Sequence, residues 1–282
     1  MAEIIDGNKI GEQIRAEVAK GVEELKNSKG VTPGLAVIIA GDDPASKVYV
    51  RNKQKACEKL GIYSEEHALP GDVSEEKLLS VIDELNENPR IHGILVQLPL
   101  PKQINPDKVL NRVSPEKDVD GFHPINVGKL MVGADTFVPC TPQGIMALLE
   151  YTGVEIAGKE AVIVGRSNLV GKPILQLLLQ KNATVTVCHS KTNDLSSHTK
   201  GADILVAAVG SPQLINGEMV KEGVTIIDVG VNRVDNKLVG DVDFESVKDK
   251  AARITPVPGG VGPMTIAMLM KNVLKAAKQS VS

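Results

Sequence analysis

Tyr49 and Lys53 are the first residues in the sequence whose types and spacing could support chemistry. They lie four positions apart in a segment, Pro44–Leu60, whose pattern predicts a helix, so both side chains should project from one helix face. A phenol beside a primary amine can position the amine, and an amine partly shielded from water can transfer a proton. Tyrosine and lysine at this spacing also commonly form a solvated helix face, so the pair alone leaves both interpretations open.

Gln97, Asp118 and Asp120 are further polar candidates. Gln97 lies in the apolar run 93–98, at the end of a predicted strand, which is where ligands bind in parallel sheets. A buried glutamine needs a hydrogen-bond partner, so its amide could engage a catalytic amine or be satisfied within the core. Asp118 and Asp120 follow in an irregular segment, where adjacent acids either face a ligand or stabilise turns.

The segment 161–173 has the pattern of a strand, a glycine turn and a helix. Gly165 permits the tight turn, Gly171 permits close packing of helix on sheet, and the helix N-terminus then offers free N–H groups to a phosphate. The spacing departs from the GxGxxG dinucleotide fingerprint, because Ser167 occupies the position of the second glycine. The context favours nucleotide binding, and a purely structural turn is the alternative.

The next predicted strand, Thr184–Cys188, bears on which dinucleotide is bound. Sites for NAD usually have an Asp or Glu about 20 residues after the glycine turn, which binds the ribose 2′-hydroxyl. Here the strand is followed by His189, Ser190 and Lys191, with no carboxylate. Arg166, Ser190 and Lys191 could instead meet a 2′-phosphate. The sequence therefore favours NADP, and solvated loop residues are the alternative.

A segment rich in glycine and proline, Pro256–Pro263, precedes the last predicted helix, Met264–Lys278. Glycine has no side chain, so such a backbone can approach a flat ligand closely. The segment is too rich in these two residues for an ordinary connection, and it is a further candidate for ligand binding.

Apolar runs of strand length alternate with amphipathic stretches of helix length, which is the pattern of α/β folds with parallel sheets. In the first half, the pattern predicts helices over Ile10–Lys26, Pro44–Leu60, Ser74–Leu85 and Pro106–Val113, and strands over Leu35–Ala40 and Ile91–Leu98. An irregular stretch, 114–141, should contain the change of domain. The second half should contain a helix from Thr141 to Tyr151 and strands over Ala161–Val164, Thr184–Cys188, Ile204–Ala208 and Thr225–Val229.

The composition favours a globular protein that acts on a small molecule. A chain of 282 residues is long enough for two domains, and 42% hydrophobic with 24% charged residues is ordinary. The net charge of −3, without a basic stripe, argues against nucleic acid or a membrane surface as partner. Three scattered cysteines predict reduced thiols, and five scattered histidines predict no metal site. No apolar run has the length of a signal peptide or membrane span, which predicts a cytoplasmic protein.

Six motifs, taken in order along the chain, resemble one family. They are YVRNK, GILVQLPLP, KDVDGFHP, PCTPQGI, GRSNLVGKP and TPVPGGVGPMT. On these motifs the chain closely resembles the bifunctional methylenetetrahydrofolate dehydrogenase/methenyltetrahydrofolate cyclohydrolase family of bacterial type. The resemblance implies an α/β fold with two domains and a cleft between them. Residues 1–140 would form an α/β catalytic domain completed by the C-terminal helix, 264–282, and residues 141–263 a Rossmann-like NADP-binding domain.

The resemblance also implies roles for individual residues. Lys53 is expected to be the central catalytic residue, with Tyr49 orienting it and Gln97 binding it and tuning its protonation. Asp120 is expected to accept hydrogen bonds from the amino-pyrimidine edge of the folate pterin. The other folate-binding residues would be Val96, Leu98, Pro258, Gly259, Gly260, Gly262 and Pro263. The NADP-binding residues would be Gly165, Arg166, Ser167, Gly171, Ser190 and Val231. Family members are typically homodimers through the cofactor domain.

The implied activity is NADP-dependent oxidation of 5,10-methylenetetrahydrofolate to the methenyl compound, and hydrolysis of that product to 10-formyltetrahydrofolate. The alternatives are a dehydrogenase with weak or no cyclohydrolase activity, a dehydrogenase that prefers NAD, and a non-catalytic nucleotide sensor. An enzyme built like shikimate dehydrogenase would share the architecture, but the C-terminal segment 256–263 favours folate. The spacing of Tyr49 and Lys53 also resembles that of short-chain dehydrogenases. In that family, however, the glycine turn precedes the pair, whereas here it follows.

Overall fold

The computed structural model describes residues 2–235 and 237–281, which fall into two compact units. The three-stranded unit contains Gln13–Val138 and the residues from Ile266 onward. The six-stranded unit contains the residues up to Glu12 and Pro139–Thr265. The sequence expectation grouped residues 1–140 with 264–282, whereas these units divide the chain after Glu12, after Val138 and after Thr265.

Strand pairing explains why the N-terminal residues group with the six-stranded unit. Strand β1 (Glu3–Ile4) pairs in parallel with β11 (Arg253–Ile254), and the N–H of Ile5 donates to the carbonyl oxygen of Ile254 at 2.9 Å. These backbone bonds fix the first residues to the sheet of the six-stranded unit.

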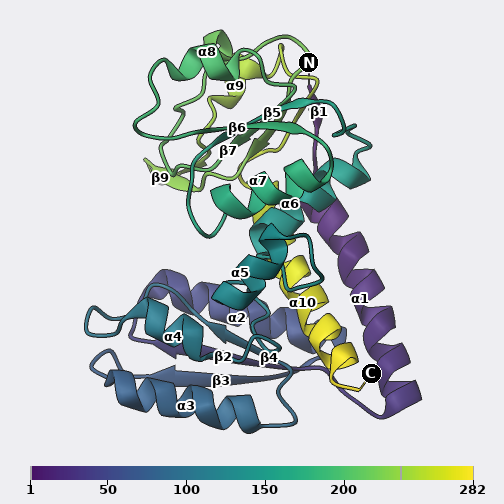
Figure 1. Ribbon diagram of the computed structural model, residues 1–282, viewed down its shortest axis with the longest axis vertical. Coiled ribbons are helices and arrows are strands. Elements are labelled where there is room, and N and C mark those ends of the chain that lie inside the picture. The colour runs from purple at the N-terminus through teal and green to yellow at the C-terminus, as the bar shows by residue number, and fades with distance from the viewer. Residues whose placement is uncertain (1, 236, 282) are drawn as a thin grey trace. The chain divides into compact units, whose positions relative to one another are not determined.

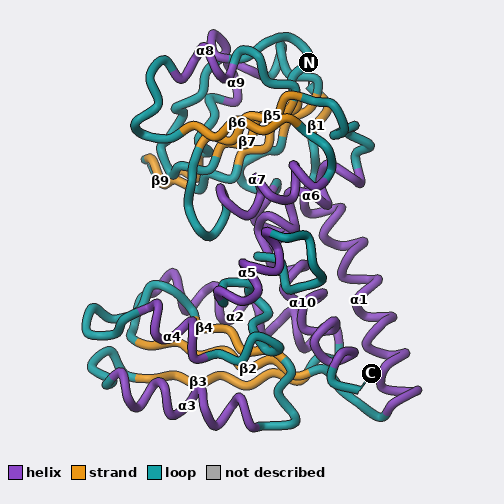
Figure 2. Tube along the Cα trace, viewed as in Figure 1, coloured by secondary structure: helices purple, strands orange, loops and turns teal. Residues whose placement is uncertain are grey.

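The three-stranded unit is built on a parallel sheet in the order β3-β2-β4. Its strands are β2 (Gly34–Ala40), β3 (Tyr63–Leu69) and β4 (Gly93–Val96). The central strand β2 is buried along its whole length, as its uninterrupted apolar sequence predicts. Figure 2 shows these three strands side by side.

Helices cover both faces of this sheet (Figure 1). Helix α2 (Pro44–Leu60) packs against β2 and β3. The opposite face of β2 packs in one core cluster with α3 (Glu75–Glu87) and α4 (Pro106–Arg112). Helix α1 (Gly7–Lys29) has its buried side chains three or four residues apart, which gives it one apolar face.

Local sequence signals explain where these helices begin and end. The side chain of Asp43 accepts the N–H of Ser46 at 2.7 Å, and Pro44 takes the first helical position of α2. Gly61 ends α2 in a left-handed conformation with φ 70°. Helix α3 begins in the same way, because the hydroxyl of Ser74 accepts the N–H of Lys77.

The six-stranded unit contains a parallel sheet in the order β1-β11-β8-β7-β5-β6. Its remaining strands are β5 (Glu160–Val164), β6 (Thr184–Cys188), β7 (Ile204–Ala207) and β8 (Thr225–Asp228), close to the four strands predicted. Its helices are α6 (Cys140–Tyr151), α7 (Gly171–Gln180), α8 (Leu195–Thr199) and α9 (Phe244–Val247). A short antiparallel hairpin, β9 (Asn232–Val234) with β10 (Lys237–Val239), and a 3₁₀ turn, Gly217–Met219, complete the unit.

Several elements differ from the sequence predictions, including the short strands β1, β9, β10 and β11, which no pattern predicted. Strand β3 was not predicted, because it is an edge strand whose half-exposed residues are polar, including Glu65 and His67. The stretch 114–141 contains a helix, α5 (Pro124–Met131). The last helix, α10 (Val261–Gln279), begins three residues before the predicted Met264.

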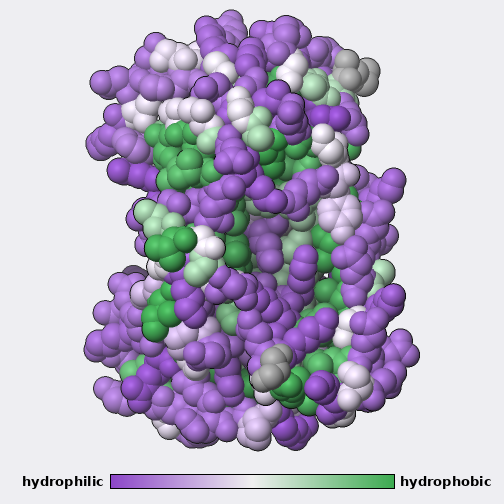
Figure 3. Space-filling model, turned by 45° about the vertical axis from the view of Figure 1, so that its right-hand side comes forward, coloured by the Kyte–Doolittle hydropathy of each residue, from purple (hydrophilic) through white to green (hydrophobic). Residues whose placement is uncertain are grey.

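None of the described helices is long and apolar enough to cross a membrane. In Figure 3, hydrophilic side chains cover most of the visible face, with apolar patches between them.

Candidate functional site

Lys53 and Gln97 are brought together at one end of the three-stranded sheet. The side-chain nitrogen Nζ of Lys53 on α2 donates to Oε1 of Gln97 at 3.0 Å. Gln97 directly follows β4, and its N–H donates to the carbonyl oxygen of Ile38 at 2.8 Å, so the backbone of β2 holds it in place. Both side chains are half buried. The contact joins residues that are 44 positions apart, as the resemblance implied.

The amide of Gln97 is oriented by a second hydrogen bond. Its Nε2 donates to the carbonyl oxygen of Leu98 at 2.7 Å, which leaves Oε1 directed at Lys53. Leu98 is half buried and Val96 is only 6% exposed. Tyr49, one helix turn before Lys53, is 51% exposed. The chain therefore presents an amine with a fixed acceptor, next to a phenol that is open to a ligand.

The two linker carboxylates have different surroundings. Asp118 is 5% exposed and accepts the backbone N–H groups of Phe122 at 3.2 Å and His123 at 2.8 Å, and the side-chain amide of Asn126 at 2.8 Å. It is therefore a structural residue that stabilises the turn before α5. Asp120 is half buried, two residues further along the same turn.

A backbone contact brings this turn alongside β4. The N–H of Ile94 donates to the carbonyl oxygen of Lys117 at 2.8 Å, and Ile94 forms a parallel bridge with Asp118. The segment that carries Asp120 thus lies next to the strand that leads to Gln97.

The glycine turn of the six-stranded unit has the geometry that the sequence predicted. Gly165 has φ +127°, and a Cβ there would lie 2.2 Å from the carbonyl oxygen of Ala208. A Cβ on Gly171, the first residue of α7, would lie 2.3 Å from the carbonyl oxygen of Gly165. Ser167, in the position of the second glycine, uses its hydroxyl to accept the N–H of Val170 at 3.1 Å. Its side chain therefore stabilises the turn that enters α7.

The end of β6 lies next to this turn. The N–H of Gly165 donates to the carbonyl oxygen of Cys188 at 2.9 Å. Ser190 and Lys191 come two and three residues after Cys188, so this hydrogen bond holds their segment beside the glycine turn. Arg166, Ser190 and Lys191 are all exposed. The structure thus places three polar side chains near one sheet edge, with no carboxylate among them.

Asp241 is a site residue that the sequence did not reveal. It is fully buried, and its carboxylate accepts the N–H groups of Val209 at 2.7 Å, Gly210 at 3.0 Å and Ser211 at 2.9 Å. It also accepts the side-chain amide of Asn232 at 2.9 Å. These residues follow the carboxyl ends of β7 and β8, where dinucleotides bind in such sheets.

A second buried carboxylate, Asp228, holds Asp241 in turn. Its Oδ1 accepts the N–H of Gly230 at 3.0 Å and of Asp241 at 2.9 Å, and its Oδ2 accepts the N–H of Val242 at 3.0 Å. Burial raises the pKa of Asp228 to about 6, although its three backbone hydrogen bonds oppose the shift and the charge of Asp241 adds to it. A Cβ on Gly240 would lie 1.8 Å from Oδ2 of Asp228, so glycine is required there. The only sequence signal is the nearby glycines: Gly230 follows Asp228 by two residues, and Gly240 directly precedes Asp241.

Val231 lies in the loop after β8, which these two carboxylates anchor, and its side chain is 56% exposed. The predicted cofactor residue is therefore held at the carboxyl end of the sheet with an apolar side chain open to a ligand.

The Gly- and Pro-rich segment packs backbone against backbone in the six-stranded unit. The N–H of Gly7 donates to the carbonyl oxygen of Gly259 at 2.9 Å, and a Cβ on Gly7 would lie 1.7 Å from the carbonyl oxygen of Gly260. Pro258 is exposed, whereas Gly262 and Pro263 belong to the first turn of α10. These predicted folate residues lie in a different unit from Lys53 and Gln97.

Neither a metal centre nor a reactive thiol is present among the described residues. No group of three or more His, Cys, Asp or Glu residues there has the arrangement needed to hold a metal ion. All three cysteines are buried, and burial raises the pKa of the Cys57 thiol to about 12.

A six-stranded parallel sheet with a glycine turn at the end of β5, in a chain that also carries an oriented amine–amide pair, defines a nucleotide-dependent α/β enzyme. Comparison with known proteins identifies the family. Residues 5–120 match the catalytic domain, and residues 139–281 the NAD(P)-binding domain, of tetrahydrofolate dehydrogenase/cyclohydrolase. The chain belongs to this family.

Individual relatives agree over the full length. The bifunctional protein FolD 2 of Geobacter sulfurreducens is 59% identical over 281 residues, which are 99% of this chain and 98% of the relative. The FolD crystal structure from Campylobacter jejuni has 50% identity and a TM-score of 0.97, with 99% of each chain covered. The Trypanosoma brucei FolD, complexed with NADP cofactor and inhibitor, has 42% identity and a TM-score of 0.95, covering 99% of this chain and 98% of that one. The chain is accordingly an enzyme with methylenetetrahydrofolate dehydrogenase and methenyltetrahydrofolate cyclohydrolase activities.

Proposed function

We propose that Lys53 is the central proton-transfer residue of this enzyme, that Gln97 orients it, and that NADP is the hydride acceptor. The observation that carries the proposal is the 3.0 Å hydrogen bond from the Lys53 amine to Oε1 of Gln97. An amine held by a neutral acceptor keeps its remaining hydrogens or its lone pair for a substrate.

In the oxidation, a C–H bond of the methylene carbon breaks and the hydride leaves with both electrons, so a methenyl cation remains on the folate. NADP, when bound at the turn of Gly165, supplies the acceptor for this hydride. No proton is released in this step, so the contribution of the chain is orientation and exclusion of water. Tyr49, Val96 and Leu98 are the residues near Lys53 that we assign to holding the folate ring.

In the hydrolysis, water attacks the methenyl carbon and forms a C–O bond. The attacking water loses a proton, which the Lys53 amine accepts. The bond from this carbon to N5 then breaks, its electron pair goes to N5, and Lys53 returns the proton there. The hydroxyl proton leaves to solvent as the formyl C=O forms. The step consumes one water, releases one proton and leaves Lys53 unchanged.

We also assign folate binding to Asp120 and, in the six-stranded unit, to the segment 258–263. A carboxylate is an acceptor that matches the N–H donors of an amino-pyrimidine edge. Pro258 and Gly262 are exposed, Gly259 and Pro263 are half buried, and Gly260 is buried, so most of this segment offers backbone with few side chains.

The preference for NADP over NAD rests on the end of β6. Arg166, Ser190 and Lys191 are exposed near the glycine turn, with no carboxylate among them to bind a ribose 2′-hydroxyl. A guanidinium and a hydroxyl are suitable donors to a 2′-phosphate. The remaining assigned cofactor residues, Gly171 and Val231, border the same strand ends.

We also propose that the enzyme is a cytoplasmic homodimer that associates through the six-stranded unit. The hairpin β9–β10 carries Val234 at 41% and Leu238 at 44% exposure, which is an apolar surface suited to self-association. Light scattering on the purified protein tests this, because a single mass near twice 30.0 kDa is expected.

The deciding experiment follows reduction of NADP and of NAD, in parallel, by the purified protein with 5,10-methylenetetrahydrofolate, and then measures methenyl hydrolysis. We expect faster reduction of NADP, accelerated hydrolysis, and loss of hydrolysis in Lys53→Ala. Lys55→Ala is the matched control, since Lys55 is exposed on the same helix. If Lys53→Ala hydrolyses the methenyl compound as fast as the native enzyme, Lys53 is not the proton-transfer residue. If NAD is reduced faster than NADP, the cofactor assignment is wrong.

A further inference from the structure

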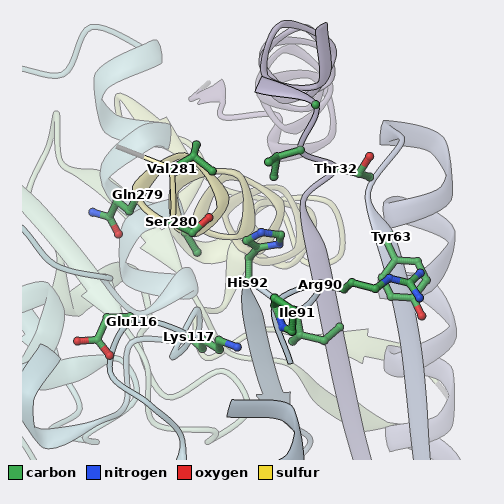
Figure 4. A pocket seen from close by; sticks show the side chains of 14 residues that line it. Thr32, Tyr63, Arg90, Ile91, His92, Glu116, Lys117, Gln279, Ser280 and Val281 are labelled. Carbon is green, nitrogen blue, oxygen red and sulfur yellow. The ribbon is translucent and has the colours of Figure 1, made fainter. Parts of the chain in front are cut away.

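A cavity lies in the three-stranded unit, at the end of the sheet opposite Gln97. It has a volume of about 770 Å³ and is lined by residues near the starts of the strands, among them Tyr63 of β3 and His92 just before β4 (Figure 4). Gln97 follows the other end of β4, so this cavity is distinct from the Lys53–Gln97 pair. Its volume falls in the range of small-molecule sites, about 300–1,000 Å³. We call it the strand-start cavity.

His92 presents a defined donor to the strand-start cavity. Its ring is only 8% exposed, and its Nδ1 accepts the N–H of Gly34 at 3.0 Å. Burial, followed by the charge of Lys117, lowers the pKa of His92, so the ring is neutral at neutral pH. A neutral ring whose Nδ1 is an acceptor must carry its hydrogen on Nε2. Among the described residues no acceptor binds this N–H.

Arg90 adds a positive charge with unused donors. Its guanidinium lies over the ring of Tyr63, 4.4 Å from the ring centroid. Stacking uses the face of the guanidinium and leaves its in-plane N–H groups available. Its charge contributes to lowering the pKa of Glu65, but it forms no ion pair within the described part of the chain.

Lys117 supplies a second positive charge deeper in the cavity wall. Its amine donates to the carbonyl oxygens of Leu85 at 3.0 Å and Asn88 at 2.9 Å, at the C-terminal end of α3. Burial lowers its pKa, although the charge of Glu87 opposes the shift. The acid that lines the cavity is Glu116. Its carboxylate accepts the hydroxyl of Ser114, and Figure 4 shows it directed away from His92 and Arg90.

The other walls are mixed. Val31, Ile91, Ala276 and Val281 are apolar, and Thr32, Gln279 and Ser280 are polar lining residues. We propose that the strand-start cavity binds a small organic carboxylate with an apolar body, whose carboxylate is held by the guanidinium of Arg90, while His92 lines the same cavity. A planar carboxylate matches the fork of guanidinium N–H groups. Lys117 stabilises the anion by its charge, and the apolar walls bury the rest of the ligand.

Benzoate is the probe for this proposal. Titration of the whole enzyme, labelled at histidine and followed by NMR, should shift the His92 ring resonance saturably, with a Kd on the order of 1–10 mM for so small a ligand. The pKa of His92 should rise in the complex, because a bound anion favours the protonated ring. Comparison with His92→Gln assigns the resonance, and benzamide, which has the same shape without the charge, should leave it unmoved.

Arg90→Gln should weaken benzoate at least about tenfold, because it removes a charge-assisted bidentate contact. Arg112→Gln is the matched control, since Arg112 is paired with Asp83 in the same unit and does not line the cavity. Lys53→Ala should retain the His92 shift, which distinguishes this cavity from the folate site. Benzoate should also raise the Tm of the native enzyme and of Arg112→Gln, but not of Arg90→Gln.

The proposal is overturned if benzoate gives no saturable His92 shift, or if benzamide or Arg90→Gln gives the same shift. A shift with inorganic phosphate but not with benzoate would assign the cavity to a different class of anion. These outcomes are independent of the two folate activities, which the same samples report separately.

Discussion

The amine of Lys53 and Oε1 of Gln97 lie 3.0 Å apart, although helix α2 carries one residue and the end of β4 the other. Gln97 cannot rotate freely, because its Nε2 donates to the carbonyl oxygen of Leu98 at 2.7 Å. An acceptor that is itself fixed holds Lys53 in one position without adding a charge. The proposed proton transfer therefore depends on an uncharged neighbour as much as on the amine.

Replacing Gln97 tests this dependence. Gln97→Leu removes the acceptor but retains an apolar side chain of similar size, so Lys53 loses its orientation. We expect hydrolysis to fall by about 10²-fold, the lower end of what a positioned acid or base contributes, with a smaller loss in the oxidation. Gln54→Leu, on the same helix as Lys53 but bonded to Glu66, is the control. Equal losses in both variants would show that the effect is not specific to the pair.

Asp241→Asn tests whether the buried carboxylate organises the nucleotide site. The change preserves size but places an NH₂ group against backbone N–H donors, so the loop 209–211 should detach. We expect the KM for NADP to rise about tenfold or more, while hydrolysis, which uses no nucleotide, should remain. Asp203→Asn is the control, because Asp203 pairs with Lys221 at the opposite end of β7. A fall in both activities together would indicate general destabilisation instead.

Much of this arrangement could be predicted from sequence, where the signal is local. Helix α2 follows from Asp43 and Pro44 at its start, and the glycine turn from the spacing of Gly165 and Gly171 after an apolar run. The sequence pattern places Lys53 on the face of a helix and Gln97 at the end of a strand. Their contact followed only from the resemblance to a known family.

The remainder depends on contacts that are distant in sequence. Asp241 is 31 residues from Gly210, whose N–H it accepts, and no local pattern encodes that distance. The N-terminal strand β1 has two residues, too few for a periodic signal, and it is fixed by β11 near the other end of the chain. Such features arise from packing of the whole unit.

The raised pKa of Asp228 gives a pH dependence with a definite sign. Its pKa is about 6 in the folded chain against an ordinary 3.8, so the folded state binds a proton more tightly than the unfolded state. This group therefore adds stability as the pH falls from 7 towards 4, by up to about 3 kcal/mol, and loses it as the pH rises through 6. Denaturant unfolding of the native enzyme and of Asp228→Asn at pH 4.5 and 7 should show a difference in free energy that favours the native enzyme more at pH 4.5. A pH-independent difference would contradict the assignment.

Gly165→Ala should disrupt the nucleotide site. The residue has φ +127°, and its new Cβ would lie 2.2 Å from a backbone oxygen, so the turn must move. We expect a loss of at least about 2 kcal/mol of unfolding free energy, together with loss of NADP reduction. Gly201→Ala in the same unit is the control, since its Cβ would meet nothing closer than 3.8 Å. An unchanged KM for NADP in Gly165→Ala would show that this turn does not bind the cofactor.

Ser190→Asp tests the choice between the two dinucleotides directly. The residue follows β6, at the place where NAD sites carry the carboxylate that binds the ribose 2′-hydroxyl. A carboxylate there repels a 2′-phosphate and offers NAD an acceptor, so the two substrates should respond in opposite directions. We expect kcat/KM for NADP to fall by about 10–100-fold and that for NAD to rise, with methenyl hydrolysis as the internal control. A parallel fall for both dinucleotides would mean that Ser190 supports the loop and does not contact the phosphate. If kcat/KM changes for neither dinucleotide, Arg166 and Lys191 rather than Ser190 bind the 2′-phosphate. Arg166→Gln would then test that assignment.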